Sequence, residues 1–138
     1  MSSAIGALLS IVALWACMAF LCCAGAPGTP RELSAEHRNA INSALRSRGY
    51  PLPQSLEINE GGWLVATFEL SGRPPGGSFE AFGTDAVVTI REAMLRFKLV
   101  NNYRVTVNGP SPGTGLIRRY GSARFIEGGD VEWEEGIR

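Results

Sequence analysis

The basic residues in the second half of the chain are the side chains whose number and spacing could bind a ligand. Residues 91–124 include seven lysines and arginines and a single acid, whereas residues 127–135 include five acids and no base. A surface segregated in this way would attract anionic lipid headgroups or an acidic partner. The candidates for this surface are Arg104, Arg118, Arg119, Arg124 and Tyr120. Alternatively, the acidic segment pairs with the basic strands through cross-strand ion pairs.

The stretch NGPSPGTGLIRRYGSARF, residues 108–125, has two interpretations. A phosphate-binding loop needs glycines that lead into a helix, because the N–H groups at a helix start face the anion. Here Gly113 and Gly115 lead into a strand-like segment, and Pro110 and Pro112 lack N–H groups. We therefore predict a hairpin loop followed by a strand.

Residues typical of catalytic or metal sites are scarce in this sequence. His37 is the single histidine and lies in a polar stretch, so we expect it on a solvated helix surface. The three cysteines all fall within the first 26 residues, which leaves the remainder without a disulfide or a thiolate metal site. The sequence thus predicts no catalytic residues, no metal and no cofactor.

The segment 4–26 carries no charge and is about as long as a membrane-spanning helix, roughly 20 residues. It is open to three interpretations. Ala24, Gly25 and Ala26 would form an A-x-A signal-peptidase site, Cys17 is a lipidation candidate because Leu14 stands three residues before it, and the length favours an uncleaved anchor. We divide the chain into a signal peptide or membrane anchor at 1–26 and a single domain at 27–138.

Charge also bears on the compartment and the partner. The formal net charge is zero, which argues against a nucleic-acid partner. Four arginines between residues 31 and 48 follow the apolar segment, and the positive-inside rule would keep the domain in the cytoplasm. A short apolar run before a whole domain is more typical of export. We predict a membrane-associated domain outside the cytoplasmic membrane, periplasmic or extracellular, in a bacterium whose GC-rich genome explains the arginines.

The periodicity of apolar residues predicts the elements that would position these side chains. Helices are expected within 29–49, capped by Thr29 or Ser34, and over 83–98, with Asp85 near its positive end. Strands are expected at 56–59, 63–70, 102–108 and 116–129, with a short edge strand around Val131 and Trp133. The order α-β-β-α-β-β predicts an α+β fold with two helices packed on one face of a four- to five-stranded antiparallel sheet, after an N-terminal hydrophobic helix.

The pieces HRNAINSALRSRG, LEINEGGWLVATFELSG, AVVTIREAML and NYRVTVNG, within residues 37–109, follow one another in a layout that resembles the BON domain, a small bacterial envelope module. The chain differs by a proline-rich insertion at 71–78 and an added hairpin at 110–135. The resemblance implies a non-enzymatic, periplasmic protein associated with phospholipid or other envelope components. No functional residues carry over from it.

These observations lead to one expectation and two alternatives. We expect a membrane-tethered or exported, non-enzymatic envelope module that binds anionic lipid or a protein partner through a basic sheet edge. The first alternative is an assembly subunit of an envelope complex whose sheet edge adds to a neighbour's strand. The second is a small exported hydrolase.

Overall fold

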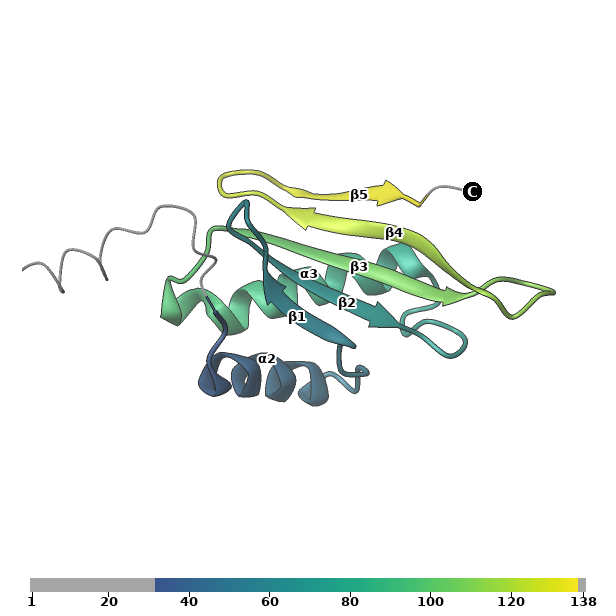
Figure 1. The fold of residues 1–138 in the computed structure, drawn as a ribbon, viewed down its shortest axis with the longest axis horizontal. Coiled ribbons are helices and arrows are strands. Elements are labelled where there is room, and N and C mark those ends of the chain that lie inside the picture. The colour runs from purple at the N-terminus through teal and green to yellow at the C-terminus, as the bar shows by residue number, and fades with distance from the viewer. Residues whose placement is uncertain (1–31, 137–138) are drawn as a thin grey trace, which may run out of the picture.

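The computed structural model describes residues 32–136, which form an α+β fold as predicted. The helices are α2 (Ala35–Ser47) and α3 (Phe79–Met94), and a 3-10 turn, η1 (Leu95–Phe97), follows α3. The strands are β1 (Ser55–Ile58), β2 (Trp63–Glu69), β3 (Asn102–Pro110), β4 (Ile117–Phe125) and β5 (Val131–Glu135). Figure 1 shows α3 running along one face of the sheet, with α2 beside it. The predicted hydrophobic helix lies outside the described residues.

The five strands form one sheet in the order β1-β2-β3-β4-β5. The predicted antiparallel sheet is wrong at one pairing, because β2 and β3 are parallel while the other neighbours are antiparallel. The reason is the connection: α3 carries the chain from the end of β2 back to the sheet end where β2 began. The next strand therefore runs in the same direction as β2, as in other crossover connections.

Helix α2 begins at a reciprocal cap. The Ser34 hydroxyl accepts a hydrogen bond from the His37 N–H at 3.3 Å, and the Ser34 N–H donates to His37 Nδ1 at 3.1 Å. Ser34 is thus the observed cap, and Thr29 lies outside the described residues. The helix ends at Ser47, and Gly49 follows it as the predicted stop, with a φ of 72° in the left-handed region that favours glycine.

Helix α3 begins four residues earlier than predicted. The Ser78 hydroxyl accepts from the Ala81 N–H at 3.0 Å, so the cap precedes Phe79 and not Gly83. Consequently, Asp85 does not lie in the first turn as predicted. It faces the end of α2, where its carboxylate accepts a hydrogen bond from the Tyr50 hydroxyl and lies 3.2 Å from the Arg48 guanidinium.

The core lies between the helices and the sheet face that they cover. Strand residues on this face are buried in strict alternation, as the sequence predicted: Leu64, Ala66, Phe68, Tyr103, Val105 and Val107. Phe82 of α3 lies fully buried between two aromatic neighbours, with its ring 5.1 Å from that of Phe68 and 5.3 Å from that of Tyr50. The opposite side of the sheet, which α2 and α3 do not cover, is here called the outer face.

The two tyrosines that touch this core should make stability depend on alkaline pH. Burial raises the pKa of the Tyr50 hydroxyl above its usual value near 10, and the hydrogen bond to Asp85 raises it further; burial also raises the pKa of Tyr103. Since the unfolded chain then loses these protons first, the contribution to stability is complete below about pH 10 and is lost above it.

Urea unfolding at pH 8 and at pH 10.5 would measure this loss. The double variant Tyr50→Phe, Tyr103→Phe should lose less stability between the two pH values than the natural chain. An equal loss of stability in both proteins would contradict the raised pKa values of these two tyrosines.

Candidate anion-binding surface

The five predicted site residues lie on β3 and β4, which are inner strands of the sheet. Arg104 is on β3, and Arg118, Arg119, Tyr120 and Arg124 are on β4. Strand β5 pairs with β4 along the side opposite β3. This pairing covers Gly121–Phe125, so Arg104 and Arg124 do not lie on the sheet edge that the sequence predicted, whereas residues 118–120 of β4 lie beyond the β5 register.

A β-bulge decides which face each β4 residue occupies. The register between β3 and β4 shifts after Val107, so that Val107 is opposite Gly121 and Asn108 is opposite Arg119. Tyr120 is the extra residue, and the alternation of side chains reverses there. Tyr120 stacks on Phe79 of α3, with the rings 3.6 Å apart, whereas Arg119 lies on the outer face and donates to the Ser122 hydroxyl at 2.6 Å.

The hairpin between β3 and β4 extends beyond the rest of the sheet (Figure 1). The predicted hairpin loop is confirmed, since Ser111 donates its N–H to the Leu116 carbonyl across it. Leu116 and Ile117 are 70% and 52% exposed, and both arginines that follow them are also exposed. We call these four residues, Leu116, Ile117, Arg118 and Arg119, the hairpin tip.

Tyr120 fixes the hairpin tip to the body of the domain. Its hydroxyl donates to the Pro110 carbonyl at 2.6 Å, its ring stacks on Phe79, and the Arg118 guanidinium lies 4.2 Å from its ring centre. Gly109 makes room for this stack, because a Cβ there would lie 3.0 Å from the Phe79 ring. The tip is thus held in one orientation relative to α3.

Arg104 and Arg124 form a second basic group on the outer face, directly opposite each other across β3 and β4. We call them the arginine pair. The Arg104 guanidinium lies 5.1 Å from the Trp63 ring, and the Arg124 guanidinium lies 3.2 Å from the Glu132 carboxylate. Within residues 32–136, the predicted cross-strand ion pairing between the basic and acidic segments is realised at Arg124 and Glu132 alone.

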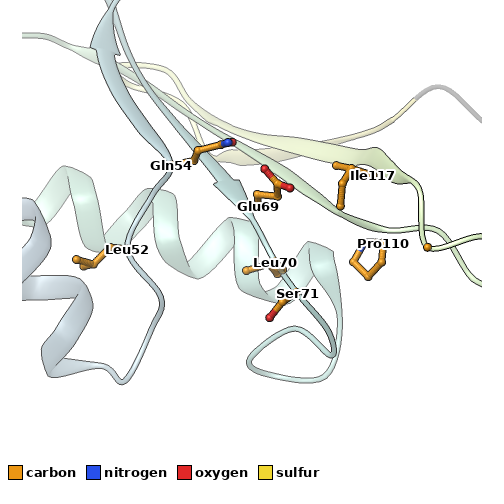
Figure 2. Close-up of a pocket in the computed structure, with 8 residues that line it drawn as sticks. Leu52, Gln54, Glu69, Leu70, Ser71, Pro110 and Ile117 are labelled. Carbon is orange, nitrogen blue, oxygen red and sulfur yellow. The ribbon is translucent and has the colours of Figure 1, made fainter.

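A groove of about 440 Å³ lies where the base of the hairpin meets the end of β2. It is lined by Leu52, Gln54, Glu69, Leu70, Ser71, Pro110, Gly115 and Ile117. Figure 2 shows the Gln54 amide and the Glu69 carboxylate directed toward the same space, with Ile117 beyond them. Sequence reasoning missed this groove because its walls come from four separate segments of the chain.

The remaining candidates do not join either basic group. His37 completes the reciprocal cap of α2 by accepting from the Ser34 N–H, and it packs edge-on against Phe97, with the rings 4.6 Å apart. Within the described part of the chain, no three His, Cys, Asp or Glu residues are grouped so that they could hold a metal ion. None of the helices described is long and apolar enough to cross a membrane, and both Cys17 and the segment 4–26 lie outside the described residues.

Comparison with known proteins gives no further guide to the site. No family model matches the chain, and no curated protein or solved structure is significantly similar to it. The function must therefore be inferred from the side chains themselves.

Proposed function

We propose that the chain is a non-enzymatic module of the cell envelope that binds an anionic membrane surface through the hairpin tip. The observation that carries this proposal is the exposure of Leu116 and Ile117 directly before Arg118 and Arg119. Apolar side chains enter the boundary between headgroups and acyl chains. Each arginine at the same depth adds about 1 kcal/mol when the headgroups are anionic.

The way in which the tip is built supports binding without rearrangement. The stack of Tyr120 on Phe79 and the bond from Tyr120 to Pro110 hold the apolar and basic side chains at the far end of the hairpin. A tip that is already ordered loses little conformational entropy on binding. The apolar segment 4–26, as an anchor or export signal, would keep the domain beside a bilayer.

Vesicle co-sedimentation tests the proposal. The chain from residue 27 retains the buried core residues of the described part, which lie between Leu33 and Ala123, and circular dichroism would verify its fold. It should bind vesicles that contain phosphatidylglycerol, bind phosphatidylcholine vesicles weakly, and dissociate as salt is added. The double variant Arg118→Ser, Arg119→Ser should bind about thirtyfold more weakly, because two contacts of about 1 kcal/mol are lost.

A matched control distinguishes the effect of where the arginines lie from the effect of the net charge. Arg38 and Arg46 are exposed on α2, so the double variant Arg38→Ser, Arg46→Ser changes the net charge equally and should bind almost normally. Unchanged binding after Arg118→Ser, Arg119→Ser would contradict the proposal. Salt-resistant co-purification with a protein partner, without vesicle binding, would favour an assembly subunit instead.

A further inference from the structure

The arginine pair presents two positive charges side by side on the outer face. In register, Arg104 is opposite Arg124 on one side and Val65 on the other. Like charges directly opposite each other in a sheet destabilise the pairing. Glu132 neutralises Arg124, but no carboxylate of the described residues lies within ion-pair distance of Arg104.

Both arginines also have an unsatisfied donor. The Nε atoms of Arg104 and Arg124 are buried, and neither has a hydrogen-bond partner among the described residues. Buried polar groups are nearly always hydrogen-bonded, and a buried donor without an acceptor is costly. An acceptor that binds both guanidinium groups would relieve the repulsion between the charges.

Arg119 brings a third guanidinium toward the same place. Its bond to the Ser122 hydroxyl directs it along β4 toward Arg124, and Ser122 in turn contacts the Thr106 hydroxyl at 3.3 Å. The acids of the outer face, which are Glu57, Glu69, Glu132 and Glu134, come from β1, β2 and β5. Strands β3 and β4 therefore have the arginines of the outer face, and β1, β2 and β5 have its carboxylates.

We propose that Arg104 and Arg124, assisted by Arg119, form a binding site for the dianionic group of a soluble phosphate monoester. A dianion matches two opposed guanidinium groups in charge, and the fork of N–H donors on arginine matches phosphate oxygens. The Trp63 ring holds Arg104 at the margin of this site.

The arginine pair is distinct from the hairpin tip, although Arg119 belongs to the tip and also assists the pair. Pro110 is six positions after Arg104 on β3, which places the arginine pair about 20 Å from the start of the loop at roughly 3.3 Å per residue. A lipid headgroup bound at the tip therefore does not reach it. The inference does not depend on the proposed membrane binding.

Nuclear magnetic resonance of arginine Nε–H groups tests the site directly. The full chain in nonionic detergent micelles would be titrated with inorganic phosphate at pH 8. The Nε–H signals of Arg104 and Arg124 should shift and saturate, while that of Arg38 on α2 should not. Arg104→Lys should weaken binding about tenfold, because an ammonium group lacks the planar fork. Arg124→Lys should have a similar effect if Arg104→Lys fails to fold.

The variant Glu132→Gln gives the most specific test of the site. It removes the carboxylate that competes for Arg124, so phosphate should bind severalfold more tightly, whereas a purely structural role of this ion pair would give no gain. Equal shifts at all arginines, or the same shifts with sodium chloride at matched ionic strength, would overturn the proposal. So would shifts that appear with phosphatidylglycerol vesicles and not with inorganic phosphate.

Discussion

Replacing Gly121 by valine should detach β5 from the sheet. The Trp133 ring of β5 packs directly over Gly121, and a Cβ at this position would overlap the ring and lie 2.6 Å from the Glu134 carbonyl oxygen. A flexible side chain could move away, but the Glu134 carbonyl belongs to the backbone of β5 and is fixed by its pairing with β4. Overpacking alone costs up to about 3 kcal/mol, and the loss of Trp133 packing adds to it.

Hydrogen exchange would show this detachment as fast exchange of β5 amides while β2 and β3 stay protected. Gly72→Val is the matched control, because no atom lies within 4 Å of a Cβ at Gly72. Equal stability and equal exchange in the two variants would contradict the close packing of Trp133. Because Glu132 lies on β5, the detached variant should also lose the Arg124 ion pair.

Phe82→Ala should lower the free energy of unfolding by about 3–5 kcal/mol, the usual cost of removing a fully buried aromatic side chain. Phe82 is completely buried and makes edge-to-face contacts with Phe68 of β2 and Tyr50, which follows α2. It therefore joins both helices to the sheet. Removing it leaves a cavity at the point where all three meet.

Urea unfolding at neutral pH would measure the loss for Phe82→Ala. Leu95→Ala is a suitable comparison, since Leu95 is 49% exposed and its truncation should cost far less. Phe82→Leu keeps most of the apolar volume, so its loss of unfolding free energy should lie between those of the other two variants. A cost for Phe82→Ala close to that of Leu95→Ala would show that the three elements are not joined at this ring.

The sequence predicted the strands well wherever one face of the sheet is buried. The alternation of Leu64, Ala66 and Phe68 with more polar residues follows from burial on one side alone, so it can be read without knowing the partner strands. The same holds for Tyr103, Val105 and Val107 on β3. In α3, the helical spacing of Val87, Ile90 and Met94 led to the correct prediction of a helix, although the neighbouring β-branched residues favour a strand.

The predictions failed where the answer depends on a distant segment. Strand directions depend on the path of α3, which the order of elements does not fix. The faces of Arg118 and Arg119 depend on the bulge at Tyr120, and a simple alternation counted along β4 would exchange them. The arginine pair requires the register between β3 and β4, which this bulge and the hairpin loop set together. The hairpin tip and the arginine pair could therefore be recognised as groups only in three dimensions.

The parallel pairing of β2 with β3 has a consequence for the chain as it is synthesised. All of residues 70–101 must leave the ribosome after β2 before β3 can pair with it, which takes on the order of seconds at about 5–20 residues per second. Until then β1 and β2 form an isolated hairpin, which is marginally stable at best in water. During this time Leu64 and Phe68, which are buried in the finished domain, have not yet been covered. The first half of the domain therefore becomes stable only when the second half has been made.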